Sequence, residues 1–367
     1  MYWQEEMRHN VTDIAQLAPA LGLTGEEREK LEKLLEHYPM SIPRYYLSLA
    51  DLNDPDDPIR RMCVPAAAEF DPEGDLDTSG EAHNTVASGV QHKYDESALV
   101  LTTNRCAMYC RHCFRKRLVG MSDEEILSHF GEMVAYVREH EEISNVILSG
   151  GDALMLPTAT LERYLEELSQ IPHIDLIRIA SRIPVVFPMR VFEDEALLSL
   201  FRRYTQKKQI YLVTQFNHPN ELTAQARTAV QALLRCGVVV KNQTVLLRGV
   251  NDSVETLGAL LRKLTAFGVV PYYVFQCRPV TGVLSNFQVP FLEALPIVEG
   301  AKAMQSGQGK CFKYCLSHPT GKIEIVGLVG ENRMAFKYHQ TKDKHNAGRI
   351  FIRELSETDG WLGDIGD

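Results

Sequence analysis

The chain has 367 residues, of which 45% are hydrophobic and 24% charged, and its formal net charge is −9. This composition is that of a globular protein and excludes an intrinsically disordered, collagen-like or small disulfide-stapled chain. The excess of acidic residues argues against general binding to nucleic acid or to an anionic membrane.

The N-terminus has neither the basic region nor the apolar stretch of a signal peptide, and no apolar run approaches the roughly 18 residues of a membrane helix. Eight cysteines in so long a chain do not form a disulfide framework, and three of them fall within residues 106–113. We therefore expect a cytoplasmic protein with metal or redox chemistry and no membrane partner.

Residues 1–95 are expected to wrap around the rest of the chain as helix and irregular segments. Thr24 and Glu27 have the spacing of a capping box, ahead of leucines at helical spacing. Turn-forming residues dominate the stretches 51–58 and 69–75.

From residue 96 the pattern changes, and short apolar runs alternate with longer amphipathic stretches. Strands are predicted at 98–103, 145–149, 175–180, 209–215, 238–245 and 270–276. Helices are predicted at 122–140, 158–170, 193–206, 221–236 and 252–267, with capping patterns at 122–125 and 252–255. This alternation predicts parallel strands, in a partial barrel or in a flat doubly wound sheet.

Three cysteines follow the first of these strands at C-x3-C-x2-C spacing: Cys106, Cys110 and Cys113. A closed structural zinc site needs four ligands, whereas iron–sulfur clusters are held by cysteine thiolates. Three thiolates on a [4Fe–4S] cluster would leave one iron open to a ligand. The alternatives are a structural zinc site and three unrelated buried thiols.

The motif and its surroundings resemble the radical S-adenosylmethionine (SAM) superfamily, and within it the lysine 2,3-aminomutase family. The similarity extends from about residue 3 to about residue 324. The matching stretches are CAMYCRHCFRKR (106–117), LSGGDAL (148–154), SRIPVV (181–186), FNHPNE (216–221), NQTVLLRGVND (242–252) and PYYVFQC (271–277).

The resemblance implies a partial (β/α)6 barrel of the radical SAM type. Its parts would be an N-terminal wrap (1–95), a core (96–290) and a C-terminal segment with a short extension (291–367). In this family the open iron chelates SAM, and reductive cleavage yields the 5′-deoxyadenosyl radical that abstracts a substrate hydrogen.

Residues of the SAM and cofactor sites can be carried over one by one. Gly150, Gly151 and Asp152 match the segment that receives the amino group of SAM; glycines allow close backbone approach and a carboxylate suits an ammonium. The remaining cofactor-binding positions are Ser181, Gln215, Gln243 and His112, and Gln215 stands where the family has a histidine.

The family also uses pyridoxal phosphate (PLP), bound to a lysine as a Schiff base. Lys322 falls at that position, and such a lysine must be desolvated to be nucleophilic. Lys93 and Tyr94 match phosphate-binding positions, with Lys93 in place of an arginine. Ser97 replaces a second phosphate-binding arginine, so the phosphate site is weaker than in the family.

The substrate pocket departs most from the family pattern. Arg115 matches the residue that grips the substrate carboxylate. Two aspartates that hold the distal ammonium of lysine are replaced here by Arg278 and Cys315. A cation in place of an anion repels a lysine side chain and favours a carboxylate. We therefore expect an acidic substrate such as glutamate; the alternative is that Arg278 forms an internal ion pair.

Two further features concern metals. The zinc-binding cysteine of the family is Ser253 here, and the cysteine-bearing tail is absent, so no structural zinc is expected. Cys311 and Cys315 form an unmatched C-x3-C pair, interpreted as two partly buried thiols in preference to a redox or auxiliary-cluster site.

The sequence thus predicts a radical SAM amino-acid 2,3-aminomutase with a [4Fe–4S] cluster, SAM and PLP, a small amino-acid substrate and a flavodoxin- or ferredoxin-type reductant. One alternative is a PLP-independent radical SAM enzyme acting on another small molecule or a peptide side chain. The other is a non-catalytic Fe–S binding or sensing protein. A homo-oligomer is left open.

Overall fold

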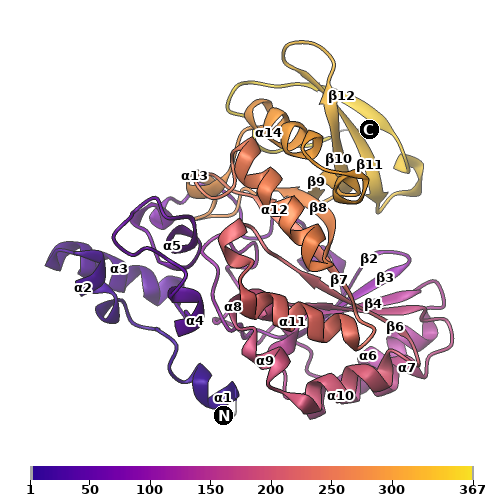
Figure 1. Ribbon diagram of the computed structural model, residues 1–367. Coiled ribbons are helices and arrows are strands. Elements are labelled where there is room, and N and C mark those ends of the chain that lie inside the picture. Colours follow the sequence, from indigo (N-terminus) through magenta and orange to yellow (C-terminus); the bar gives the residue numbers. More distant parts are fainter. Residues whose placement is uncertain (1–2, 366–367) are drawn as a thin grey trace.

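A computed structural model describes residues 3–365 of the chain (Figure 1). Twelve strands of the described chain form one sheet whose spatial order follows the sequence. The strands are β1 (Thr85–Ala87), β2 (Val90–Tyr94), β3 (Ser97–Thr103), β4 (Asn145–Gly150), β5 (Leu176–Ala180), β6 (Gln209–Thr214), β7 (Val239–Leu246), β8 (Val270–Gln276), β9 (Lys313–His318), β10 (Gly321–Leu328), β11 (Arg333–Thr341) and β12 (Ile350–Glu354).

The helices fall into an N-terminal group and a group that alternates with the strands. The first comprises α1 (Trp3–Met7), α2 (Ala18–Leu21), α3 (Gly25–His37), α4 (Arg44–Leu47) and α5 (Pro58–Cys63). The second comprises α6 (Phe130–Glu139), α7 (Thr158–Ser169), α8 (Ile183–Val186), α9 (Met189–Phe192), α10 (Glu195–Tyr204), α11 (Ala224–Arg235), α12 (Val254–Phe267), α13 (Leu284–Phe287) and α14 (Phe291–Ala303).

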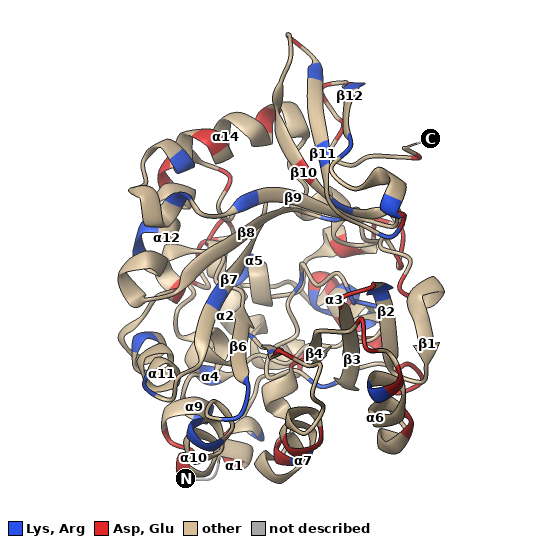
Figure 2. Ribbon diagram, turned by 90° about the vertical axis from the view of Figure 1, so that its right-hand side faces the viewer, with Lys and Arg blue, Asp and Glu red and all other residues tan. Residues whose placement is uncertain are grey.

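Strands β3 to β9 are parallel, and antiparallel strands extend the sheet at both ends. Figure 2 shows the parallel strands curving around an interior, with helices such as α6, α7, α11 and α12 outside. Since β1 and β12 are the two ends of the strand order, the described barrel is open. The predicted partial barrel is confirmed, and the flat doubly wound sheet is not what the chain forms.

All six predicted strands are present as β3 to β8, within one or two residues at each end. The alternating pattern is clear in β7, where every second side chain from Val240 to Leu246 is buried. The sequence analysis missed β9, a seventh parallel strand that pairs with β8, and the hairpins β1–β2 and β10–β11.

The capping box predicted at the start of α3 is present, whereas the cap of α12 lies one residue after the start of the predicted 252–255 pattern. The Thr24 hydroxyl accepts a hydrogen bond from the Glu27 amide, and the Glu27 carboxylate accepts one from the Thr24 amide, at the start of α3. Ser253 caps α12 by accepting a hydrogen bond of 3.1 Å from the Thr256 amide.

The predicted helix 122–140 begins later than expected, at Phe130. The Leu127 amide donates to the Leu101 carbonyl of β3 at 2.8 Å, and the Glu125 carboxylate pairs with Arg117. These tertiary contacts hold residues 122–129 against the edge of the barrel, and the local capping pattern is overridden.

The N-terminal helices lie against one side of the barrel, as the indigo segment in Figure 1 shows. Their apolar side chains, including Ile14, Leu34 and Tyr46, belong to the same hydrophobic core as the barrel helices. The proposed division at residues 95 and 290 stays a prediction, because both boundaries fall within one continuous sheet and core. In the described part of the chain, no helix combines the length and apolar character needed to cross a bilayer.

Candidate active site

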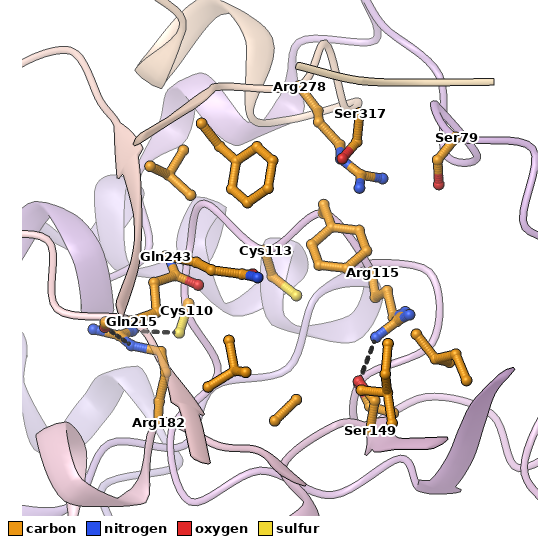
Figure 3. A pocket seen from close by; sticks show the side chains of 18 of the residues that line it. Ser79, Cys110, Cys113, Arg115, Ser149, Arg182, Gln215, Gln243, Arg278 and Ser317 are labelled. Atoms are coloured by element: carbon orange, nitrogen blue, oxygen red, sulfur yellow. Dashed lines mark hydrogen bonds between the residues drawn. The ribbon is translucent and has the colours of Figure 1, made fainter. Parts of the chain in front are cut away.

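A cavity of about 380 Å³ opens inside the barrel (Figure 3). This is within the size range of ligand pockets in enzymes. Six basic and two acidic side chains line it: Lys93, Arg115, Arg178, Arg182, Arg278 and Lys322, with Glu81 and Asp152. Such an excess of positive charge in a partly enclosed site favours anionic ligands.

The cysteine loop lies at the C-terminal end of β3, and Cys106, Cys110 and Cys113 all line the cavity. The N-terminal wrap holds this loop in place: the Tyr109 amide donates to the Ser41 carbonyl, and the Arg111 amide to the Met62 carbonyl. Active sites of parallel barrels lie at the C-terminal ends of the strands. The cysteine motif, predicted to follow the first parallel strand, lies at that end of the barrel.

The donor set fits an iron–sulfur cluster. Burial raises the pKa of Cys106, and raises that of Cys113 to about 11, although Arg182 near the first and Arg115 near the second favour the thiolates. These thiolates therefore need further positive charge beside them. Cluster iron would supply that charge. Among residues 3–365, no three Cys, His, Asp or Glu side chains are gathered closely enough to hold a single metal ion.

Arg182, a residue the sequence analysis did not single out, contacts the loop directly. Its Nη1 lies 2.6 Å from the Sγ of Cys110 (Figure 3). Its Nη2 lies 2.6 Å from the Glu221 carboxylate. A guanidinium at this distance stabilises negative charge on sulfur. Only the folded structure reveals this role, because residues 110 and 182 are far apart in the chain.

The predicted Gly-Gly-Asp segment forms the end of β4 and packs against the cysteine loop. A Cβ on Gly150, whose φ is +115°, would lie 2.3 Å from the Thr103 carbonyl oxygen, and one on Gly151 would lie 2.4 Å from that of Arg105. Glycine is therefore required for this close approach. Burial raises the pKa of Asp152 to about 6, although the amides of Arg182 and Leu154 donate to its carboxylate.

The other predicted cofactor-binding residues, Ser181, Gln215, Gln243 and His112, also line the cavity. The Gln215 amide nitrogen lies 3.1 Å from the His112 Nε2, so this glutamine orients a histidine next to two of the cysteines. The other ring nitrogen, Nδ1, is buried without a hydrogen-bond partner among the described residues.

Lys322 lies on β10 and lines the same cavity as the cysteine loop. Its Nζ donates to the Gln340 side chain at 3.1 Å and lies 4.4 Å from the centroid of the Tyr273 ring. Burial lowers the pKa of Lys322 to about 8, opposed by Cys315 and reinforced by Arg178. A partly deprotonated, desolvated amine fits a lysine that bonds covalently to PLP.

The predicted phosphate-binding residues line the cavity, but the amine of Lys93 is bound to backbone carbonyls. The Lys93 Nζ donates to the backbone carbonyls of His318 at 2.6 Å and Ser79 at 3.3 Å. Burial lowers the pKa of Lys93 to about 7. Tyr94 and Ser97 line the cavity with it. Arg178 is a further lining residue, and its Nε is buried without a partner in the described structure.

Arg115, for which the sequence analysis predicts binding of the substrate carboxylate, is paired with Glu81 in the structure. The Glu81 carboxylate accepts hydrogen bonds from the Arg115 Nε at 2.9 Å and from its Nη2 at 2.7 Å. The Ser149 hydroxyl accepts a third, from Nη1, at 3.0 Å. Both charged side chains are buried, and Arg115 with two other cations holds the pKa of Glu81 at about 2 despite burial. Glu81 carried no motif and was missed.

Arg278, by contrast, has a free donor in the cavity. Its Nη1 is buried without a hydrogen-bond partner in the described chain, and its guanidinium lies 4.2 Å from the centroid of the Phe114 ring. Burial lowers the pKa of Arg278 to about 10, partly offset by Glu81. Within residues 3–365, no ion pair joins Arg278 to an acidic side chain, whereas Arg115 is paired with Glu81.

Cys315 does not line the cavity, contrary to the sequence-based expectation. It is fully buried on β9, and burial raises the pKa of its thiol to about 12. Ser317, two residues along the same strand, reaches the cavity beside Arg278 instead (Figure 3). Cys311 is exposed while Cys315 is buried, so the pair does not share one environment.

Comparison with known proteins places this geometry in a family. A relative in Aquifex aeolicus, provisionally named L-lysine 2,3-aminomutase, is 42% identical over 92% of this chain and 91% of its own length. L-lysine 2,3-aminomutase of Clostridium subterminale is 37% identical over 93% of this chain and 80% of its own length. The chain belongs to the lysine 2,3-aminomutase family of radical SAM enzymes.

The family contains more than one substrate specificity. Glutamate 2,3-aminomutase of Clostridioides difficile is 35% identical over 87% of this chain and 74% of its own length. A radical SAM methyltransferase structure from Sphaerobacter thermophilus is similar with a TM-score of 0.42 and 16% identity, over 62% of this chain and 68% of its own. No family model matches the chain. As a radical SAM aminomutase, the chain is an enzyme, so the non-catalytic alternative no longer applies.

Proposed function

We propose that this enzyme is a 2,3-aminomutase that moves the α-amino group of an acidic amino acid, glutamate in the first instance, to the β-carbon. The observation that carries the substrate assignment is Arg278, a half-buried residue that lines the cavity and whose Nη1 has no hydrogen-bond partner among the described residues. A carboxylate satisfies such a donor, whereas the ammonium of a lysine side chain is repelled by it.

The cofactor sites in the proposal are those that the geometry fits. Cys106, Cys110 and Cys113 would hold the cluster, and Gly150 to Asp152 would form the backbone wall for SAM. Lys322 would hold PLP. When bound, these groups supply a carbon-centred radical and an electron sink for amino-group migration.

This chain's own residues bind, orient and enclose the reactants. Arg278 and Ser317 would bind the side-chain carboxylate at one end of the cavity. The Tyr273 ring and the barrel wall exclude water from the Lys322 amine. Desolvation strengthens each of these polar contacts and protects a radical from solvent.

The proposal also includes a cytoplasmic location and a flavodoxin- or ferredoxin-type electron donor. All eight cysteines are free thiols in the structure, which suits a reducing compartment. Cleavage of SAM by a reduced cluster needs such a one-electron donor.

The test is product analysis with anaerobically reconstituted enzyme, SAM, PLP and dithionite. We expect conversion of L-glutamate to 3-aminoglutarate, with L-aspartate, L-lysine and L-alanine as competing substrates. Turnover of lysine with none of glutamate or aspartate would refute the acidic-substrate assignment.

A second candidate is a radical SAM enzyme that works without PLP. It is favoured by Lys93, whose amine is held by two backbone carbonyls, and by Ser97 at a position where the family has an arginine. Under this alternative, 5′-deoxyadenosine would form without any amino-acid isomer and without dependence on PLP.

A further inference from the structure

Glu81 and Arg115 form a buried pair on the wall of the cavity, and Glu81 comes from the turn-rich segment ahead of β1 rather than from the barrel. Side-chain exposure is 9% for Glu81 and 6% for Arg115. The Glu81 carboxylate therefore occupies the face of the guanidinium that a carboxylate ligand would use.

All three guanidinium nitrogens of Arg115 already donate hydrogen bonds, and the paired face formed by Nε and Nη2 is taken by Glu81. Its Nε and Nη2 bind Glu81, and its Nη1 binds the Ser149 hydroxyl at 3.0 Å and approaches the Gly150 carbonyl at 3.4 Å. An incoming carboxylate can bind both Nε and Nη2 of this arginine only by replacing Glu81.

A second position for the Glu81 carboxylate lies next to the first. Its Oε2 already accepts a hydrogen bond of 3.1 Å from Arg117 Nη2. Arg117 Nη1 is buried without a hydrogen-bond partner among the described residues. A displaced carboxylate would satisfy that donor, so displacement does not leave a bare buried charge.

The backbone around Glu81 is held in place during such a change. Asp77 accepts hydrogen bonds from the Glu81 amide at 2.8 Å and from the Ala82 amide at 3.1 Å. Rotation of one side chain is therefore enough, without movement of the segment.

We propose that the Glu81 side chain occupies the carboxylate-binding face of Arg115 in the substrate-free enzyme. It moves to Arg117 when the carboxylate of the substrate binds. The proposal rests on the proposed function only for the identity of the ligand as an amino acid. Exchanging one carboxylate for another at Arg115 changes the free energy of substrate binding little, so the role of Arg115 is to orient the substrate. Net affinity comes from Arg278, whose donor is otherwise unused.

The experiment measures ligand binding and not turnover, so that its outcome does not depend on whether the proposed reaction takes place. Glutarate, a dicarboxylate without an amino group, is titrated calorimetrically into anaerobically reconstituted wild-type enzyme, Glu81→Gln and Glu81→Asp. Glu125→Gln is the matched control, because Glu125 also binds Arg117 but not Arg115.

Removing the competing charge should tighten glutarate binding by about tenfold or more in Glu81→Gln. Glu81→Asp, whose shorter side chain reaches Arg115 less well, should show a smaller gain in the same direction and keeps the test available if Glu81→Gln does not fold. Glu125→Gln should stay within about twofold of wild type.

Unchanged or weaker glutarate binding in both Glu81 variants, or no binding by any of the proteins, would overturn the proposal. Tighter binding without glutamate turnover would support displacement at Arg115 and refute the substrate assignment. Turnover of glutamate with no tightening in the variants would refute displacement and leave the proposed function standing.

Discussion

The Lys322 amine lies over the face of the Tyr273 ring, 4.4 Å from its centroid, and Lys322 lines the same cavity as Cys106, Cys110 and Cys113. An aromatic face favours the charged amine, yet burial outweighs it and brings the pKa of Lys322 down to about 8. The barrel thus presents a lysine that is partly neutral near physiological pH.

The first prediction concerns covalent binding of PLP. Wild-type enzyme with added PLP should show the absorption band of lysine-bound PLP near 420 nm, by general PLP chemistry, and Lys322→Ala should lose it. Lys93→Ala is the control, because Lys93 also lines the cavity with a lowered pKa and should keep the band at weaker PLP affinity. A band that depends on Lys93 instead would reassign the lysine.

The second prediction is the pH dependence of this reaction. Only the neutral amine reacts, and with a pKa of about 8 its fraction rises from roughly a tenth at pH 7 to half at pH 8. The rate of band formation should follow this curve and level off by about pH 9. Because the folded-state pKa is below the ordinary 10.5, this lysine's contribution to stability rises between pH 8 and 10.5. A rate still rising steeply above pH 9.5 would contradict the buried setting.

The third prediction reverses the charge that selects the substrate. Arg278→Asp should abolish turnover of glutamate, since truncating or reversing a buried charge partner costs at least about 2 kcal/mol of binding. The same variant should gain measurable affinity for lysine, checked by competition with both amino acids. Arg278→Lys should retain part of the glutamate activity. Equal glutamate turnover in Arg278→Asp and wild type would show that another residue recognises the side chain of the substrate.

The fourth prediction uses the glycines that touch the cysteine loop. Gly151→Ala should lose SAM binding and reduce iron content, because its Cβ would lie 2.4 Å from the Arg105 carbonyl oxygen in a position where only backbone could move. Gly131→Ala in α6 is the control, since nothing lies within 4 Å of its added Cβ. That exposed helical substitution should stabilise the fold by about 0.5 kcal/mol. Iron analysis and thermal melting check both.

The fifth prediction addresses Ser253. Ser253→Ala removes the cap of α12 and should lower the free energy of unfolding by about 1 kcal/mol, measured by chemical denaturation. Iron and zinc contents should be the same as in wild type, with no stoichiometric zinc in either. Zinc bound at one per chain would mean that the protein builds a zinc site without a cysteine at position 253.

The periodic core and the cysteine motif were predictable because each depends on local sequence. Alternating burial in β7 and the C-x3-C-x2-C spacing need no knowledge of distant residues. Glu81, Arg182 and Ser317 were not predictable, because their partners lie on elements far away in the chain. Cys315 was misplaced for a related reason: an aligned position fixes the strand, while the depth of each side chain along it depends on how the barrel closes.

The failure at 122–129 has the same origin. Four residues matched a capping pattern, but the Leu127–Leu101 backbone hydrogen bond and the Glu125–Arg117 ion pair decided the conformation. The free energy gained from local helix propensity is smaller than that gained from the tertiary contacts of this segment.

The backbone bonds from Ser41 and Met62 to the cysteine loop have a practical consequence for anyone who trims this protein. A shortened chain that starts at β3 would keep Cys106, Cys110, Cys113 and every parallel strand, yet the loop carrying these three thiols would lose its scaffold. The smallest fragment able to assemble a cluster therefore includes the first sixty or so residues, although they contribute no ligand to it.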